Sequence, residues 1–224
     1  MNFDYPARIN IELTNCCNLA CSTCMRHGWD EELGEMELCL AERIIDEAAG
    51  MPGPPLVFFG GFGEPLTYRG VEGLIRRASE AGCRTGLITN GILLGEEVSE
   101  ALVDAGLDML WVSIDGATPE SFADIRLGDH LTEILRNLES FRGVVRRRRR
   151  GASDSRRTPG LGFATVLMKR NLHELPALLQ IARRLKVSRI VTTNIDPHDE
   201  ASADEMLYAD ELYGGADMEP RISL

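Results

Sequence analysis

The sequence predicts an α/β fold built on a parallel β-sheet. Six short segments rich in Ile, Val, Leu, Phe and Thr lack the helical period, and helix-like segments lie between them. Strands that alternate with helices run parallel and are joined by right-handed crossovers. Six such units fit either most of a barrel or a doubly wound sheet, and periodicity alone does not separate these architectures.

The expected strands follow one another along most of the chain. They are residues 8–14, 56–60, 85–90, 109–115, 162–168 and 189–195. Each is short and rich in β-branched or large apolar residues, which is typical of strands buried in a parallel sheet. The sequence shows no internal repeat beyond this alternation of strand and helix.

The helices between them carry recognisable end signals. Two segments, "VEGLIRRASEAG" and "EEVSEALVDAG", end at Gly82 and Gly106, where a left-handed C-cap is expected. In "ELPALLQIARRLK", Pro176 predicts that the regular helix begins near Leu175. Asn171 and Glu174 precede that helix in a pattern that resembles a capping box.

Composition limits the functions that are open. The 224 residues are 44% hydrophobic and 26% charged, and the net charge is −11, which argues against a general nucleic-acid or membrane binder. The amino terminus has no signal-peptide pattern and no apolar run is long enough to span a bilayer, so we expect a cytoplasmic protein. The basic run at 146–157 predicts a solvated helix end that continues into a flexible loop, with a polyanion patch as the alternative.

Four of the six cysteines lie in "CCNLACSTC", directly after the first expected strand. Because cytosolic thiols stay reduced, this cluster indicates metal or redox chemistry rather than disulfides. Cys17, Cys21 and Cys24 can ligate three irons of a [4Fe-4S] cube and leave the fourth iron without a protein ligand. With His27 the same cysteines give the alternative of a tetrahedral Cys3His zinc site. Cys39 and Cys83 are expected to be buried apolar residues.

The order of several motifs resembles the radical SAM enzymes. The spacing C-x3-C-x2-C follows the first strand, "GGFGEP" follows the second, "TNG" the third, "SIDG" the fourth and "NIDPHD" the sixth. The resemblance covers about residues 8 to 200. Position Thr23 departs from it, because the family usually has a bulky apolar residue before its third cysteine, and the usual adenine contact from this loop is therefore in doubt.

The resemblance implies a partial (β/α)6 TIM-type barrel and a specific reaction. A [4Fe-4S] cluster cleaves S-adenosyl-L-methionine reductively to a 5′-deoxyadenosyl radical, which abstracts hydrogen from a substrate. It also implies an external electron donor. The pattern is most similar to the subgroup of peptide, protein or cofactor maturases with a cysteine-rich C-terminal extension, including presumed maturases of tungsten-containing oxidoreductases. No cysteine follows Cys83, so we expect a core domain at 1–200 and a tail at 201–224, which either starts such an extension or belongs to a member that lacks one.

The resemblance assigns roles to single residues, and each has a structural alternative. The backbone of Gly61, Gly63 and Glu64 would receive the methionine amino group, or simply form a tight turn. Ser113 and Asp115 would bind the cofactor, or cap a helix. Arg126 would pair with the methionine carboxylate, or lie on the surface. Three more assignments are equally open: Asn90 as cofactor contact or turn residue, and Asn194 and Ile195 beside the adenine or in ordinary strand packing. No catalytic residue is predicted.

Overall fold

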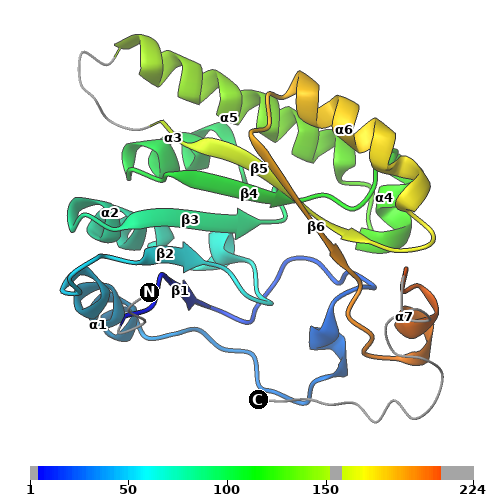
Figure 1. Cartoon of the computed structure of the whole chain (residues 1–224), viewed down its shortest axis with the longest axis horizontal. Helices are drawn as coiled ribbons and strands as arrows, with labels where there is room; N and C mark the ends of the chain where they lie inside the picture. The colour runs from blue at the N-terminus through cyan, green and yellow to red at the C-terminus, as the bar shows by residue number, and fades with distance from the viewer. Residues whose placement is uncertain (1–4, 152–157, 208–224) are drawn as a thin grey trace.

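The computed structural model describes residues 5–151 and 158–207, and it contains one parallel sheet (Figure 1). The strands pair in the order β1-β2-β3-β4-β5-β6, and every pairing is parallel. They are β1 (Arg8–Ile11), β2 (Leu56–Phe59), β3 (Arg84–Thr89), β4 (Met109–Ser113), β5 (Gly160–Leu167) and β6 (Arg189–Asn194). The sheet curls into a half-barrel, which confirms the expected α/β fold.

Seven α-helices are described between and after the strands. They are α1 (Leu38–Ala49), α2 (Val71–Glu80), α3 (Glu96–Asp104), α4 (Pro119–Arg126), α5 (Leu131–Gly151), α6 (Leu175–Arg184) and α7 (Glu200–Asp204). Gly82 and Gly106 have φ angles of +87° and +86°, so both predicted left-handed glycines are confirmed. The helix near Pro176 begins at Leu175, as predicted.

The capping box expected before α6 is absent. Neither Asn171 nor Glu174 makes a side-chain cap hydrogen bond at α6. Their side chains instead reach backward to the loops that follow β4 and β5. The residue types fit a capping box, but the buried polar groups of those loops compete for the same oxygen and nitrogen atoms.

The two faces of the sheet have different surroundings. Side chains that point outward, among them Val57, Phe59, Leu87, Leu110 and Leu161, have no exposed surface because the helices cover them. Residues that point inward are more open, and the edge strand β6 is exposed on both faces at every position except Asn194. The main core therefore lies between the sheet and the helices, and the concave face of the half-barrel is accessible.

The carboxyl ends of the strands meet at one edge of the sheet. Figure 1 shows their arrowheads on the right, beside the segment that follows β1 and close to α4 and α7. β1 is shorter than predicted and ends at Ile11. The chain then passes through Thr14, which forms an isolated antiparallel bridge with Glu35. All candidate motifs therefore lie at the same end of the half-barrel.

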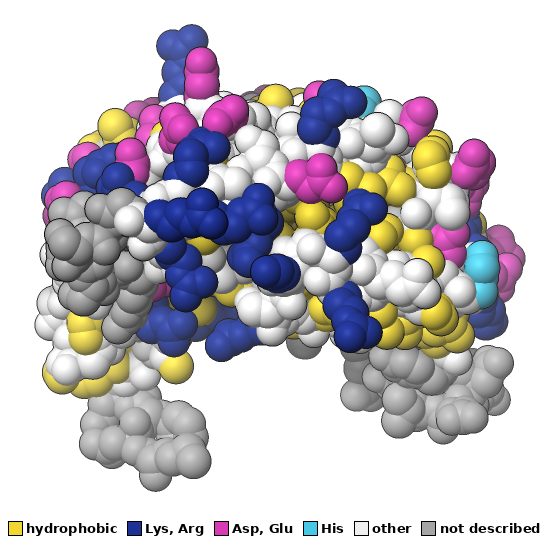
Figure 2. Space-filling model, turned by 90° about the horizontal axis from the view of Figure 1, so that it is seen from above, with side chains coloured by type: hydrophobic (Ala, Val, Ile, Leu, Met, Phe, Trp, Pro, Cys, Tyr) yellow, Lys and Arg dark blue, Asp and Glu magenta, His cyan; other side chains and the backbone are white. Residues whose placement is uncertain are grey.

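The arginine run extends α5 to Gly151. Figure 2 shows dark-blue side chains gathered over this side of the molecule, where α5 and α6 lie. Arg146 to Arg150 are exposed, which agrees with a solvated helix end, while residues 152–157 lie outside the described part of the chain. No helix in the described ranges is long and apolar enough to cross a membrane.

The two remaining cysteines differ in their surroundings. Cys83 is buried, as predicted, and burial raises the pKa of its thiol. Cys39 is exposed, so its expected burial was wrong. It lies in the first turn of α1, whose buried face is formed by Ala41, Ile45 and Ala48.

Candidate functional site

The cysteine loop follows β1 and is tied to α4. Cys17 and Cys24 are partly exposed, Cys21 is 8% exposed, and all three thiols are free. Ser22 anchors the loop, because its backbone N–H and its hydroxyl both donate to the carbonyl of Ile125, at 2.9 and 3.0 Å. A loop that begins at β1 is thus held by a helix more than a hundred residues further along the chain.

The glycine loop after β2 packs directly against the start of the cysteine loop. Glu64 donates its backbone N–H to the carbonyl of Cys16 at 2.8 Å. A Cβ atom on Gly63 would lie 1.9 Å from the carbonyl oxygen of Thr14, so only glycine allows this approach of two backbones. Directly after β1, the carboxylate of Glu12 accepts hydrogen bonds from the N–H groups of Phe62 and Gly63, at 2.5 and 3.2 Å.

The side chain of Glu64 connects β2 to β3. It is 2% exposed, and its carboxylate accepts from the N–H groups of Leu66, at 3.0 Å, and Asn90, at 2.8 Å. Burial raises the pKa of this carboxyl, and the hydrogen bonds from Asn90 and Leu66 oppose the rise. Glu64 therefore holds the ends of two neighbouring strands together, in addition to its backbone contact with the cysteine loop.

Asn90 forms the turn that was one of its two expected roles, and its contact with a cofactor stays a prediction. Its side-chain oxygen accepts from the N–H of Ile92, and Gly91 has a φ angle of +84°, so Asn90 forms an Asn-Gly turn. Its amide also donates to the side chain of Asn18 at 2.8 Å and lies 3.9 Å from the sulfur of Cys17. The end of β3 thus supports the cysteine loop from the side opposite to α4.

A buried ion pair lies beside Cys21. Nη2 of Arg126 lies 2.5 Å from Oδ2 of Asp115, and Nη1 of Arg126 is 3.6 Å from the sulfur of Cys21. The other oxygen of Asp115 accepts from the N–H of Val166 at 2.8 Å. Asp115 is fully buried, so both of its oxygens face protein groups and its contact with the site runs through Arg126.

The loop that carries Asp115 is held by two further polar side chains. The amide of Asn171 donates to the carbonyls of Asp115 and Val166, both at 2.8 Å. The carboxylate of Glu174 accepts from the N–H of Ala117 and from the hydroxyls of Ser121 and Thr118. These contacts fix the loop between β4 and α4, and with it the ion pair.

The remaining predicted residues take different positions. Ser113 ends β4 and is partly exposed. The side-chain oxygen of Asn194 accepts from the N–H of Leu207 at 3.0 Å. Ile195 is 4% exposed and packs with Ile125, Met168 and Met206, so the described start of the tail lies against the core at this edge. Thr23 is partly exposed within the cysteine loop.

Three residues near the thiols were missed in the sequence: Glu12, Asn18 and Arg26. Arg26 lies in a 3₁₀ turn at Met25–Gly28 and donates from Nη2 to the carbonyl of Leu19 at 3.0 Å. Its Nε is buried and has no hydrogen-bond partner in the part of the chain that the structure describes. A signal existed for Glu12, because it continues the inward-facing positions of β1, but Asn18 and Arg26 carry no pattern that distinguishes them from ordinary loop residues.

The donor set suits an iron–sulfur cluster. Burial raises the pKa of the Cys17 thiol, as do the nearby Glu64 and Cys21, while the backbone N–H of Leu19 and the guanidinium of Arg26 lower it. A bound metal would favour the thiolate form of this side chain. Within residues 5–151 and 158–207, no three His, Cys, Asp or Glu side chains are close enough to hold a single metal ion. A cube places each thiolate on a different iron, so its ligands need not converge on one point. The side chain of His27, needed for the zinc alternative, lies outside the described part.

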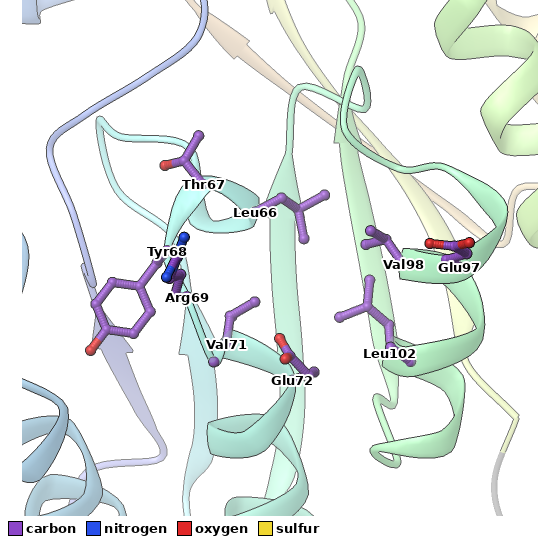
Figure 3. A pocket seen from close by; sticks show the side chains of 11 residues that line it. Leu66, Thr67, Tyr68, Arg69, Val71, Glu72, Glu97, Val98 and Leu102 are labelled. Atoms are coloured by element: carbon purple, nitrogen blue, oxygen red, sulfur yellow. The ribbon is translucent and has the colours of Figure 1, made fainter.

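A pocket of about 460 Å³ lies elsewhere, between α2 and α3 on the helix-covered side of the sheet (Figure 3). Leu66, Val98 and Leu102 face one another across it, with Glu72 and Glu97 at its margin. None of the predicted site residues lines this pocket. The candidate site is therefore the edge formed by the cysteine loop and the neighbouring strand ends.

Comparison with known families gives a match over most of the described chain. The sequence model of the Radical SAM superfamily matches residues 11–151. That range contains the three cysteines, the glycine loop, Asn90 and the ion pair between Asp115 and Arg126.

Three curated relatives illustrate the similarity. A tungsten-containing aldehyde ferredoxin oxidoreductase cofactor-modifying protein of Pyrococcus furiosus is 28% identical over 95% of this chain and 57% of its own length. An AdoMet-dependent heme synthase of Methanosarcina barkeri is 34% identical over 80% of this chain and 48% of its own length. A PqqA peptide cyclase of Rhodopseudomonas palustris is 32% identical over 86% of this chain and 48% of its own length. The chain thus spans about half the length of the curated relatives it matches.

Solved structures share the fold. Streptococcus suis SuiB bound to the precursor peptide SuiA has a TM-score of 0.70 and 19% identity, over 86% of this chain and 40% of that one. Native anSMEcpe with bound AdoMet has a TM-score of 0.69 and 18% identity, over 85% of this chain and 52% of that one. At these identities the likeness concerns the half-barrel and its strand order.

Proposed function

The chain belongs to the radical SAM superfamily, and on that premise we propose that it is an enzyme that cleaves S-adenosyl-L-methionine at a [4Fe-4S] cluster and acts on a peptide or a cofactor precursor. When bound, the cluster supplies an electron that breaks a carbon–sulfur bond of S-adenosylmethionine and yields methionine and a 5′-deoxyadenosyl radical, which abstracts hydrogen from the substrate. The protein supplies binding, orientation and exclusion of water.

The observation that carries the proposal is the meeting of four strand ends around one cysteine loop. Cys17 lies beside Asn90 from β3, and Cys21 lies beside Arg126 after β4. Gly63 after β2 contacts the loop that begins at β1. A loop that only held a structural metal would need none of these supports, whereas a cofactor bound at the metal needs groups from several strands.

We assign Cys17, Cys21 and Cys24 as the cluster ligands. Three thiolates leave one iron without a protein ligand, and that open position is what binding of a small cofactor requires. Arg126 would stabilise thiolate charge at Cys21, since its guanidinium already faces that sulfur. Asp115 acts as its positioning residue, because one of its oxygens pairs with Arg126 and the other is bonded to a backbone N–H.

The cofactor-binding residues follow the same edge. The partly exposed backbone around Gly61 and Gly63 would receive the methionine amino group, and Ser113 would bind its carboxylate or the ribose. Asn194 and Ile195, at the end of β6, would lie beside the adenine. Glu64 and Asn90 would hold the glycine loop and the cysteine loop in place rather than contact the cofactor through their side chains, because those side chains already bind protein groups.

The relatives support the substrate class. Proteins named as a peptide cyclase, a heme synthase and a cofactor-modifying protein match 80% or more of this chain. We therefore propose a peptide or a cofactor precursor as substrate, an external electron donor as partner, and no nucleic acid. We also propose a cytoplasmic location, where thiols stay reduced, and a core domain at 1–200 followed by a tail at 201–224.

The test is anaerobic reconstitution of the full chain with iron and sulfide, followed by addition of dithionite and S-adenosylmethionine. We expect visible iron–sulfur absorbance, about four irons per chain, and release of 5′-deoxyadenosine. Cys21→Ala should lose both signals, and Cys39→Ser should retain both because Cys39 is exposed on α1. A colourless protein that holds one zinc and releases no nucleoside would overturn the proposal and favour the Cys3His site.

A further inference from the structure

Two arginines from separate segments of the chain contact the cysteine loop. Arg126 ends α4 and places its Nη1 atom 3.6 Å from the sulfur of Cys21. Arg26 follows Cys24 in the 3₁₀ turn and donates from Nη2 to the carbonyl of Leu19 at 3.0 Å. The segment between the first two cluster cysteines is therefore bonded by one guanidinium at Leu19 and by another at Cys21.

The contact of Arg26 with Leu19 leads directly to the sulfur of Cys17. Leu19 is buried, and its backbone N–H donates to that sulfur at 3.5 Å. Burial raises the pKa of the Cys17 thiol most strongly, and the positive charge of Arg26 is among the effects that oppose this rise. Arg26 therefore acts on Cys17 in two ways, because its hydrogen bond fixes the peptide that bonds the sulfur and its charge is felt at the thiol.

The Nε–H group of Arg26 is a buried donor that protein atoms leave free. Nε has no hydrogen-bond partner among residues 5–151 and 158–207, and Arg26 forms no ion pair within these ranges. Nε of Arg126 is likewise buried and without a partner there. A buried donor without an acceptor is costly, so it indicates an acceptor that the described protein atoms do not supply. Both free donors belong to the arginines that contact the cysteine loop, where the cluster would bind.

An iron–sulfur cluster has the chemistry that these donors require. Its sulfide and thiolate sulfurs accept hydrogen bonds, and a [4Fe-4S] cube with three thiolate ligands is an anion. Reduction by one electron adds negative charge to it. Hydrogen bonds to the sulfurs and a nearby positive charge therefore stabilise the reduced form more than the oxidised form, and the reduction potential of the cluster rises.

From these contacts we propose that Arg26 binds the cluster: its Nε–H donates to a cluster sulfur beside Cys17, and its charge stabilises the reduced state. The inference rests on the proposed function and adds to it a residue that is not a ligand. Arg26 then acts at Cys17 as Arg126 acts at Cys21. Because the electron that cleaves S-adenosylmethionine must first enter the cluster, Arg26 determines how readily an external donor delivers that electron.

The test measures the reduction potential of the reconstituted full chain in the absence of S-adenosylmethionine. A redox titration followed by electron paramagnetic resonance gives the midpoint potential, and iron analysis of the same samples gives the cluster content. We expect Arg26→Gln to retain its iron and to disfavour the reduced state about tenfold, which lowers the potential by about 59 mV. Arg26→Lys keeps the charge and should recover part of this shift.

Arg136→Gln is the matched control for the change in net charge. Arg136 is exposed on α5, away from the cysteine loop in the chain and in the fold, so its replacement should leave the potential at the wild-type value. Equal potentials of Arg26→Gln and the wild type would overturn the inference, and so would an equal shift in Arg136→Gln. A shift in Arg26→Lys as large as that in Arg26→Gln would also overturn it, because the effect would then not depend on the charge.

The lysine variant also decides the case in which Arg26→Gln does not retain its cluster. Arg26→Lys that keeps its iron and is reduced near the wild-type potential supports the inference, whereas loss of iron from this variant as well overturns it. Release of 5′-deoxyadenosine by the wild type is measured separately. If the potential depends on Arg26 but no nucleoside is released, the proposed function fails while the inference stands. Nucleoside release with a potential that is independent of Arg26 would give the opposite result.

Discussion

Replacement of Gly63 by alanine tests the central packing contact of the site. A Cβ atom there would lie 1.9 Å from the oxygen of Thr14 and 2.8 Å from that of Cys16. Both are backbone atoms, so no side-chain rotation relieves the overlap, and ordinary contact requires the loops to separate by roughly 1.5 Å. That shift would also break the 2.8 Å hydrogen bond from Glu64 to Cys16.

The expected loss combines two effects. Overpacking of a well-packed site costs about 1–3 kcal/mol, and loss of one hydrogen bond costs about 1 kcal/mol. We therefore expect Gly63→Ala to lower the free energy of unfolding by about 2–4 kcal/mol. Because the displaced loop carries the cysteines, the iron content after reconstitution should also fall. Denaturant unfolding and iron analysis of the same samples measure both quantities.

Two other glycines make the comparison quantitative. At Gly61 the atoms nearest to an added Cβ belong to the side chain of Glu12, which can shift more easily than backbone, so Gly61→Ala should have a smaller effect. At Gly73 within α2 there is nothing within 4 Å, so alanine should stabilise the helix by up to about 1 kcal/mol. If Gly63→Ala matches the wild type in both stability and iron content, the close approach of the two loops is refuted.

Three further predictions concern polar side chains around the site. Arg126→Gln should lower the free energy of unfolding by about 3 kcal/mol, because it leaves the buried Asp115 carboxylate unpaired. Adding Asp115→Asn to this variant should recover much of the loss. A double variant no more stable than the single one would contradict the prediction. Burial raises the pKa of Glu174, but its hydrogen bonds outweigh burial and hold the pKa below the ordinary 4.5. The stabilisation that the Glu174 carboxylate contributes is therefore present above about pH 4.5 and lost as pH falls through the lowered pKa. The free energy of unfolding of Glu174→Gln should accordingly depend less on pH in the acid range. An acid profile equal to that of the wild type would count against a role of the carboxylate. Asn90→Ala should reduce retained iron because Asn18 loses its partner, whereas iron content equal to that of the wild type would show that the contact is dispensable.

Local patterns were sufficient to predict the strands and several helix ends, and they indicated the cysteines that we propose as cluster ligands. The strands, the glycines at 82 and 106, and the start of α6 depend on residues close in sequence, and the structure has them where the patterns indicate. The spacing of the three cysteines is equally local. The sequence also predicted that each motif follows a strand, and parallel strands bring their carboxyl ends to one edge.

The contacts between motifs were not accessible in the same way. Asn171 and Glu174 have the residue types of a helix cap, yet their side chains bind loops that were not visible as neighbours in the sequence. Cys39 was expected to be buried, and only the orientation of α1 placed it in solvent. Asp115 could be assigned to the cofactor edge, but its pairing with Arg126 depends on how α4 returns to the sheet.

The sequence by itself therefore determined the parallel α/β fold and the strand ends, since these follow from short-range periodicity, and its cysteine spacing indicated the proposed thiol donors. The tertiary structure alone decided which backbone atoms meet at Gly63 and which carboxylates bind protein groups. The physical reason is that burial and hydrogen bonding at this edge depend on the register between strands and on the curl of the sheet. Neither property is encoded in any one segment of the chain.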